Sequence, residues 1–221
     1  MITTIVIGDI HGSTYWKEAV RENPDCLYVF LGDYIDPYEY VSSQKLIDNL
    51  KEIMQLKQER PNDVVLLLGN HDLHYFTTDI VPSTRFDFYI AEQVSELFRQ
   101  NIHLFMYAFQ MDNYIFTHAG ISEKWFHHDF KGDVAKNIAE QLNNPLPEQI
   151  PALCRCGEMR GGRRGTVGGI FWADMDELND PLPGFTQIAG HNRVEEIRDH
   201  THNGGRIIFC DCLWNNHYLK I

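Results

Sequence analysis

One local pattern recurs in the first part of the chain and constrains how it can fold. A short apolar run is followed by glycine and then by aspartate or asparagine, at residues 4–7 before Gly8-Asp9, 26–31 before Gly32-Asp33 and 64–68 before Gly69-Asn70. Apolar runs that end in turn residues are typical of buried strands. The pattern therefore predicts strands whose carboxyl ends carry polar side chains, which is where open α/β sheets place their functional sites.

Helices are predicted between these strands. Residues 13–22 begin at a serine that can cap a helix, and residues 42–60 place apolar side chains at helical spacing, namely Leu46, Leu50, Ile53 and Met54. Strands that alternate with helices indicate βαβ units and a parallel sheet.

The rest of the chain predicts further elements without a repeat or a linker between them. A helix is expected at 88–100, strands at 103–109 and 114–117 joined at Asp112-Asn113, a helix at 133–142, a strand at 186–189, and a closing antiparallel pair at 206–210 and 217–220. We expect a single domain over residues 1–221.

Composition and charge restrict the class of protein. Hydrophobic residues make up 43% of the 221 residues, enough for a sizeable core, and the formal net charge of −12 argues against a surface that binds nucleic acid. The amino-terminal residues predict neither a signal peptide nor a membrane span. Five cysteines, an odd number, favour a reducing cytoplasm. The two Cys-x-Cys pairs, Cys154/Cys156 and Cys210/Cys212, are closer than ordinary zinc ligands and are expected to be idle thiols.

Five predicted strand-end turns carry side chains that can bind metal. They are Asp9 and His11, Asp33 and Asp36, Asn70 with His71 and Asp72, His118, and His191. Carboxylate, imidazole and amide ligands together suit manganese, iron or zinc better than magnesium or calcium. The turns therefore indicate a metal centre.

These turns, read as Gly-Asp-Ile-His-Gly, Gly-Asp-Tyr-Ile-Asp, Gly-Asn-His-Asp, His-Ala-Gly and Gly-His-Asn, resemble the calcineurin-like metallophosphoesterases. The resemblance covers residues 8–192 in the family's order and is closest to the serine/threonine phosphoprotein phosphatase branch and its bacterial and phage relatives. It implies an α/β fold, a four-layer β-sandwich of two mixed sheets flanked by helices, with the active site at the carboxyl ends of strands.

The resemblance also implies a mechanism. Two metal ions, manganese in the first place and iron or zinc as alternatives, would be held by Asp9, His11 and Asp33 and, through a bridging Asp33, by Asn70, His118 and His191. A hydroxide that bridges the two ions would attack phosphorus directly, without a phosphoenzyme. His71, held by Asp36, would be the general acid that protonates the leaving oxygen.

The chain departs from the branch at two positions. Pro37 stands where the branch has an arginine that grips the phosphate, so we expect Arg160, Arg163 or Arg164 to bind substrate together with Asn70, the alternative being a solvated basic loop. Asp72 replaces a glutamate. Arg193 stands where many phosphodiesterases of the wider family have a second histidine, which favours a phosphatase.

The expected function is hydrolysis of phosphomonoesters, on phosphorylated small molecules or on phosphoserine and phosphothreonine proteins. Two alternatives remain open at this point: symmetrical hydrolysis of a dinucleoside polyphosphate such as diadenosine tetraphosphate, and a binding module of the same fold without chemistry. We expect a cytoplasmic protein with neither nucleic acid nor membrane as a partner.

Overall fold

The structure is a computed structural model that describes residues 3–76 and 85–221. The chain divides into two compact units. The first unit consists of residues 1–106 and 213–221, and the second unit of residues 107–212.

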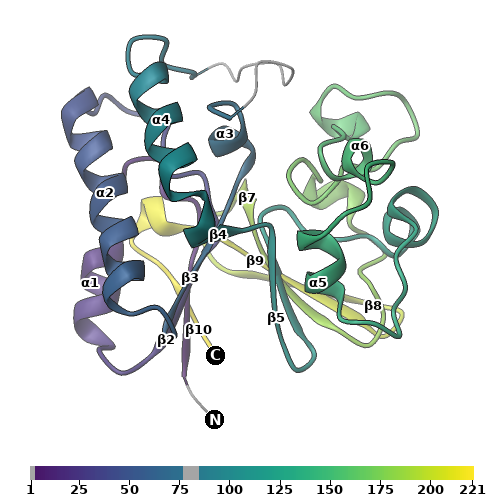
Figure 1. The fold of residues 1–221 in the computed structure, drawn as a ribbon. Coiled ribbons are helices and arrows are strands. Elements are labelled where there is room, and N and C mark those ends of the chain that lie inside the picture. The colour runs from purple at the N-terminus through teal and green to yellow at the C-terminus, as the bar shows by residue number, and fades with distance from the viewer. Residues whose placement is uncertain (1–2, 77–84) are drawn as a thin grey trace. The chain divides into compact units, whose positions relative to one another are not determined.

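A five-stranded mixed sheet forms the centre of the first unit, with the strand order β10-β1-β2-β3-β4 (Figure 1). The strands are β1 (Thr4–Ile7), β2 (Leu27–Phe30), β3 (Val64–Leu67), β4 (Phe105–Met106) and β10 (Leu219–Lys220). Strands β1 to β4 are parallel and β10 is antiparallel to β1. Because parallel strands end at the same edge, the turns after β1, β2 and β3 are neighbours.

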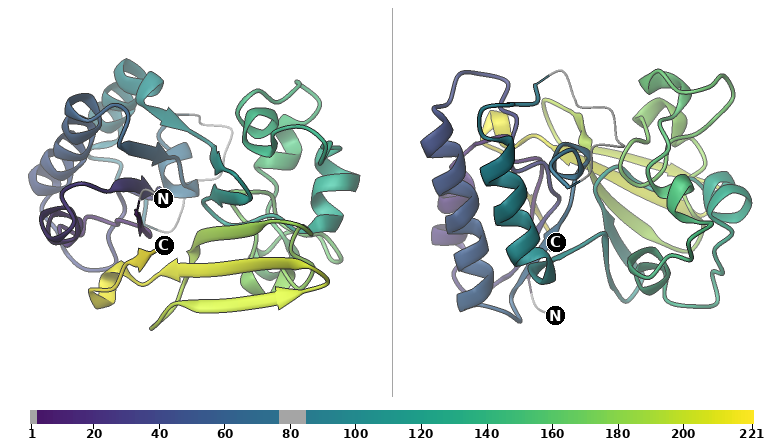
Figure 2. Two further views of the ribbon diagram at one scale, coloured as in Figure 1. Left: turned by 90° about the horizontal axis from the view of Figure 1, so that it is seen from below. Right: turned by 45° about the horizontal axis from the view of Figure 1, so that its top comes forward.

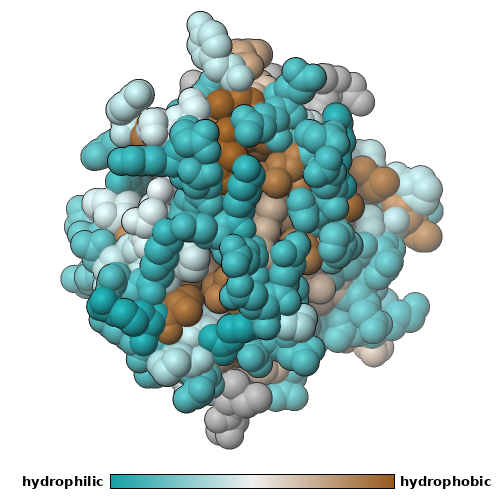
Figure 3. All heavy atoms as spheres, turned by 60° about the vertical axis from the view of Figure 1, so that its left-hand side comes forward, coloured by the Kyte–Doolittle hydropathy of each residue, from teal (hydrophilic) through white to brown (hydrophobic). Residues whose placement is uncertain are grey.

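Helices cover the first unit's sheet. They are α1 (Trp16–Glu22), α2 (Ser43–Glu59), α3 (Asn70–Leu73) and α4 (Ala91–Asn101), with short 3₁₀ turns η1 (Ile102–Leu104) and η5 (Leu213–Asn215). Figures 1 and 2 show α1, α2 and α4 along one side of the sheet. The predicted apolar stripe of α2 is buried, which confirms that prediction. The face seen from the side of these helices is mostly hydrophilic, with small hydrophobic areas between polar side chains (Figure 3).

The second unit contains the other mixed sheet, with the order β5-β6-β7-β9-β8. Its strands are β5 (Ala108–Met111), β6 (Tyr114–Thr117), β7 (Thr186–Arg193), β8 (Arg198–His202) and β9 (Gly205–Asp211). Strands β6, β7 and β9 are parallel to one another, while β5 and β8 are antiparallel edge strands. The buried Gln187 of β7 bonds both backbone groups of Ile121, which fixes the chain as it leaves β6.

Short helices complete the second unit. They are the π-helix η2 (Trp125–Phe130), α5 (Ile138–Asn143), α6 (Ile150–Leu153) and the 3₁₀ turns η3 (Glu158–Arg160) and η4 (Met175–Glu177). Trp125 and Phe130 are fully buried and stack at 5.3 Å between ring centroids. The architecture confirms an α/β fold with two mixed sheets flanked by helices. Within residues 3–76 and 85–221, no helix combines the length and the apolar character needed to cross a bilayer.

The predicted strand at residues 103–109 is wrong, because two strands in different sheets occupy this segment. β4 belongs to the first unit and β5 to the second, with Tyr107 between them. Asn143 of α5 explains the break: its Oδ1 accepts the N–H groups of Tyr107 at 2.7 Å and Ala108 at 3.1 Å. A side chain far along the sequence thus takes up hydrogen bonds that a continuous strand would have used in its ladder.

The predicted closing pair of strands is also wrong. β9 forms a hairpin with β8, which the sequence analysis did not predict, and β10 pairs with β1 in the other sheet. Asn203 and Gly204 form the hairpin loop, and both have positive φ, 46° and 83°. Asn-Gly is the preferred sequence for such a two-residue turn, so the signal was present at this position.

We expect Asn143→Ala to destabilise the chain by about 2–3 kcal/mol, because two N–H groups and the Ala108 carbonyl, which accepts from Asn143 Nδ2 at 2.8 Å, lose their partner. Urea unfolding followed by circular dichroism measures the loss. Asn144→Ala is the matched control, since its exposed side chain makes a single local bond to Glu140. Equal losses in the two variants would contradict this account.

Candidate functional site

The turn after β1 carries Asp9 and His11 and runs along the turn after β2. Ile10 N donates to Gly32 O at 3.3 Å and His11 N donates to Asp33 O at 2.7 Å. Asp9 is 4% exposed and Asp33 is 1% exposed. Two carboxylates are therefore held at the same edge of the sheet, nearly out of contact with solvent.

The His11 ring is oriented by a backbone carbonyl. Its Nδ1 lies 2.9 Å from Ile35 O, so Nδ1 carries the proton and Nε2 presents a lone pair. Nε2 lies 3.5 Å from Asp33 Oδ2 and 3.8 Å from Asp9 Oδ2. A histidine whose other nitrogen donates to a carbonyl is the usual arrangement for a metal ligand.

The carboxylate of Asp72 joins the turns after β2 and β3. It is fully buried, and its oxygens accept the N–H groups of Asp33 and Gly69, both at 2.8 Å, and of Tyr34 at 2.9 Å. Burial raises the pKa of Asp72 above its ordinary value, and the three N–H bonds act in the opposite direction. Asp72, which stands where the branch has a glutamate, therefore holds the two turns together beneath the site.

Two glycines are required where these turns meet. A Cβ atom on Gly32, whose φ is +108°, would lie 2.4 Å from Gly69 N, and one on Gly69 would lie 2.1 Å from Asp33 Oδ1. The glycines of the Gly32-Asp33 and Gly69-Asn70 blocks are explained by this close approach of two backbones.

Four of the predicted site residues have backbone angles in the left-handed region. The φ values are 40° for His11, 53° for Asp33, 59° for Asp36 and 60° for His191. Such conformations are costly for residues other than glycine, and they persist where the surrounding structure imposes them. Their concentration at the strand ends supports a functional reason for the turns.

His71 and Asp36 lie together in the first unit. His71 Nδ1 is 2.7 Å from Asp36 Oδ2, and Asp36 Oδ1 accepts the Tyr75 hydroxyl at 2.6 Å. His71 N donates to Asp33 Oδ1 at 2.8 Å, and nitrogen and oxygen atoms of His11, Asp33 and His71 lie within 4.8 Å of one another. Asn70 precedes His71 as the first residue of α3 and is buried.

His74, Tyr75 and Arg85 also reach this cluster, and the sequence analysis did not predict them. His74 is buried, its ring lies 5.7 Å from that of His71, and burial lowers the pKa of its imidazole to about 4. Arg85 donates from Nε to Asp36 O at 3.0 Å and lies 3.1 Å from His71 Nε2. They lie outside the strand-end turns, so strand-end position could not identify them.

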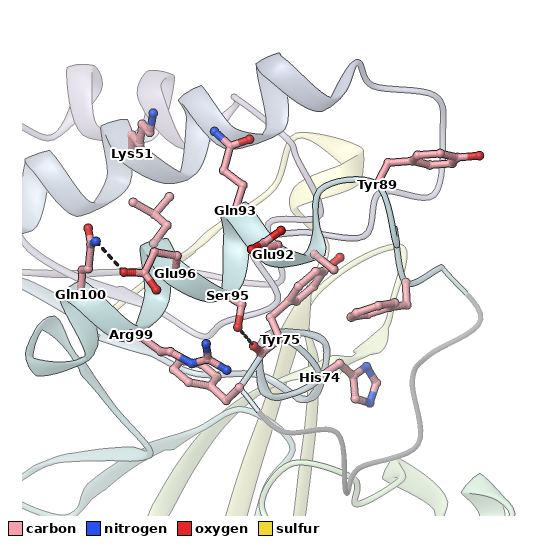
Figure 4. A pocket seen from close by; sticks show the side chains of 14 residues that line it. Lys51, His74, Tyr75, Tyr89, Glu92, Gln93, Ser95, Glu96, Arg99 and Gln100 are labelled. Atoms are coloured by element: carbon pink, nitrogen blue, oxygen red, sulfur yellow. Dashed lines mark hydrogen bonds between the residues drawn. The ribbon is translucent and has the colours of Figure 1, made fainter.

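Two pockets border this cluster in the first unit. One, of about 500 Å³, is lined by Asp36 and Arg85 and by the aromatic residues Tyr38, Tyr40, Phe86, Phe88 and Tyr89. The other, of about 1090 Å³, lies against α4 and is lined by His74, Tyr75 and polar side chains of that helix (Figure 4). Ser95 of α4 donates to the Tyr75 carbonyl, so α4 supports the tyrosine that bonds Asp36.

The second unit brings His118 and His191 together. His118 follows β6 directly and is fully buried, and His191 lies in β7 where the register with β9 shifts. Gly190 N donates to His118 O at 2.8 Å, and His118 Nε2 lies 3.2 Å from His191 Nδ1. Two ring nitrogens at this separation can share a proton or a cation.

Arg160 contacts Asn192, the residue that follows His191 in the chain. Its NH2 group donates to Asn192 Oδ1 at 2.8 Å, and its Nε pairs with Asp174 at 2.7 Å. Asn192 also donates to Ala173 O, which links Arg160 to the segment Trp172-Ala173-Asp174. Arg163 and Arg164 are exposed, in the loop that follows.

The donors present fit metal ions of the predicted kind. In the first unit, His11 Nε2 lies within 3.8 Å of a carboxylate oxygen of Asp9 and within 3.5 Å of one of Asp33, and in the second unit the imidazoles of His118 and His191 lie together. Manganese, iron and zinc accept this mixture of oxygen and nitrogen ligands.

Comparison with known proteins places these features in a family. The calcineurin-like phosphoesterase family matches residues 2–152. A PP2A-like serine/threonine-protein phosphatase, PPG1, of Saccharomyces cerevisiae is 24% identical over 207 residues, which cover 92% of this chain and 50% of that protein. A catalytic subunit of protein phosphatase 2A from Dictyostelium discoideum is 27% identical over 199 residues, with 87% and 55% covered. The chain spans about half the length of these relatives.

A solved structure shares the fold. The structure of a cold-active protein tyrosine phosphatase aligns with a TM-score of 0.60 and 14% sequence identity, and the alignment covers all of this chain and 78% of that one.

We expect Asp72→Asn to destabilise the first unit by about 3 kcal/mol, since the amide nitrogen cannot accept the N–H groups of Asp33 and Gly69 at the same position. Unfolding by urea checks the value, and metal content after dialysis checks whether the turns still bind ions. Asp25→Asn, at an exposed position, serves as the control. A fully stable Asp72→Asn variant that retains its metal would show that the carboxylate does not hold the turns.

Proposed function

Because this chain belongs to the calcineurin-like phosphoesterase family, we propose that it is a metal-dependent phosphatase that hydrolyses phosphomonoesters. One observation carries the proposal: the Asp36–His71 pair lies beside His11 and Asp33, so an acid-base pair and metal-binding side chains share one edge of the sheet. We further propose that residues 1–221 act as a single catalytic domain.

We propose that the chain holds two ions. Asp9, His11 and Asp33 would hold the first, and Asp33, Asn70, His118 and His191 the second, with manganese as the first expectation and iron or zinc as alternatives. Ions held there would lower the pKa of a bound water, so that hydroxide can attack phosphorus directly, and would offset the negative charge of the phosphoryl oxygens. The buried carboxylates of the first unit and the paired imidazoles of the second support this assignment.

His71 is proposed as the group that transfers a proton to the leaving oxygen. Asp36 orients the ring through Nδ1, which leaves Nε2 as the atom that faces substrate. Tyr75 supports this role, because its hydroxyl occupies the other oxygen of Asp36 and keeps the carboxylate from turning.

Asn70 and the basic segment remain proposed substrate contacts. Arg160 has the best support, since its guanidinium bonds Asn192, the residue that follows His191 in the chain, whereas Arg163 and Arg164 have only their positive charge and exposure. The Asp174 carboxylate fixes the Arg160 guanidinium in one orientation.

The proposed substrates are phosphorylated small molecules or proteins in the cytoplasm. The curated relatives are named serine/threonine phosphatases, whereas the solved structure of the same fold is titled a tyrosine phosphatase. The pocket lined by Tyr38, Phe86 and Tyr89 suits an aromatic group next to the phosphate. Phosphotyrosine therefore belongs among the substrates to be tested beside phosphoserine and phosphothreonine.

A panel of substrates tests the proposal. Purified chain with Mn²⁺ is assayed on p-nitrophenyl phosphate, on matched phosphoserine, phosphothreonine and phosphotyrosine peptides, and on diadenosine tetraphosphate. Hydrolysis of the monoesters is the expected result. Turnover of diadenosine tetraphosphate alone would replace this function with the dinucleotide activity, and no turnover in metal-loaded protein would indicate a binding module.

We expect His71→Asn to reduce kcat by about 10²–10⁴ on an alkyl phosphate, whose leaving oxygen needs a proton, and by much less on p-nitrophenyl phosphate. Metal content and the circular dichroism spectrum should stay unchanged. His103→Asn, at an exposed position in η1, is the control. A uniform loss on both esters would remove His71 from proton transfer.

Metal content tests the ligand assignment separately. We expect about two Mn²⁺ per chain in inductively coupled plasma measurements, and about one in the double variant His118→Ala/His191→Ala, because the second unit would then lack its imidazoles. His127→Ala/His128→Ala changes two exposed histidines and should keep both ions. One ion per wild-type chain under all conditions would overturn the two-ion proposal.

A further inference from the structure

Arg85 has a distinctive set of contacts in the first unit. Its Nε donates to Asp36 O at 3.0 Å, its NH2 lies 3.1 Å from His71 Nε2, and its guanidinium lies over the Tyr38 ring at 3.7 Å from the centroid. A carbonyl, a ring nitrogen and an aromatic face thus hold one guanidinium. None of these three partners carries a negative charge.

The direction of the bond to His71 follows from chemistry. A guanidinium can only donate, so Nε2 accepts and the proton of the ring is on Nδ1, directed to Asp36. The NH2 group of Arg85 therefore occupies the position from which an oxygen atom would contact Nε2. For His71 to act as the general acid on a leaving oxygen, Nε2 must take up a proton and that oxygen must take the place of the guanidinium.

The Tyr38 ring lies between the Arg85 guanidinium and His11, one of the proposed metal ligands. The Tyr38 ring packs edge-on against His11 at 4.9 Å between centroids, and His11 packs against His71 at 5.1 Å. Nε and the Tyr38 face hold the guanidinium, which is a rigid plane, so its NH2 group can exchange the imidazole for an anion only by a shift of the whole side chain. An oxyanion bound beside His11 and His71 is therefore within reach of a positive charge that is already in position.

We propose that Arg85 binds the phosphoryl oxygens of the substrate, and that its NH2 group moves from His71 Nε2 to those oxygens when a phosphate ester binds. This inference rests on the proposed phosphatase function. A guanidinium presents paired donors in the geometry of two phosphate oxygens, so it orients the ester as well as neutralising it. The ester oxygen then takes the vacated position at Nε2.

Arg60 provides a matched comparison within the same unit. It also lies over a tyrosine, Tyr28 at 5.0 Å, and also donates to a carbonyl, that of Cys26 at 3.3 Å. Its guanidinium in addition pairs with the Asp63 carboxylate at 3.4 Å, and it lies at the opposite end of the strands, before β3. Arg60 therefore has the stacking and the carbonyl bond of Arg85 without the histidine, and its variants control for the loss of an arginine–tyrosine contact.

The test compares Arg85→Ala, Arg85→Lys and Arg60→Ala in Mn²⁺-loaded protein of equal metal content. Steady-state kinetics on p-nitrophenyl phosphate gives KM and kcat, and calorimetry gives the Kd of inorganic phosphate. We expect Arg85→Ala to raise both KM and the phosphate Kd about 10- to 100-fold, since one charge-assisted hydrogen-bonded contact is lost. Arg85→Lys should restore part of the binding, because it returns a point charge without the paired donors. Arg60→Ala should match the wild type.

The outcomes separate this inference from the proposed function. Wild-type turnover with an unchanged phosphate Kd in Arg85→Ala would overturn the role of Arg85 and leave the phosphatase intact. A lowered kcat with unchanged KM and phosphate Kd would show that Arg85 positions His71 and does not bind substrate. A wild-type chain that neither hydrolyses phosphomonoesters nor binds phosphate would overturn the proposed function, and the assignment of Arg85 with it.

Discussion

The carboxylate of Asp72 is the contact on which the first unit's site depends. It is buried beneath two loops and accepts backbone N–H groups from both, Asp33 and Tyr34 after β2 and Gly69 after β3. Gly32 and Gly69 bring the two loops so close that no side chain fits between them. Because the loops are this close, the single carboxylate of Asp72 can accept N–H groups from both. A buried acceptor of this kind is costly to lose, since several donors would then lack partners at once.

This anchoring explains how strained residues are maintained at the strand ends. Asp33 and Asp36 keep positive φ angles on a segment whose N–H groups are bound to Asp72, and His11 follows the same segment through the carbonyls of Asp33 and Ile35. The side chains that can bind metal are therefore directed by the backbone before any ion arrives. Such pre-organisation reduces the reorganisation required when ions and substrate bind.

A line of polar contacts leads from the interior to the proposed substrate position. The Tyr75 hydroxyl bonds Asp36, Asp36 bonds His71, and His71 accepts from Arg85. Each member fixes the orientation of the next, so the ring of His71 is held on both sides. Arg85 is the last member of this series. Its NH2 group bonds a ring nitrogen, and a charged phosphate oxygen would bind a guanidinium more strongly than that nitrogen does.

Local signals in the sequence were sufficient to identify several elements. Apolar runs before Gly-Asp and Gly-Asn identified β1, β2 and β3, the spacing of Leu46, Leu50 and Ile53 identified α2, and parallel pairing implied that the strand-end side chains share one edge. Features that depend on distant residues became visible only in the folded chain. Asn143 divides the segment around Tyr107 between two sheets, β10 pairs with β1 instead of β9, and Arg85 reaches His71 from a segment outside every strand-end turn. Periodicity and motifs report the preferences of neighbours in the chain, whereas these contacts follow from the packing of segments far apart in it.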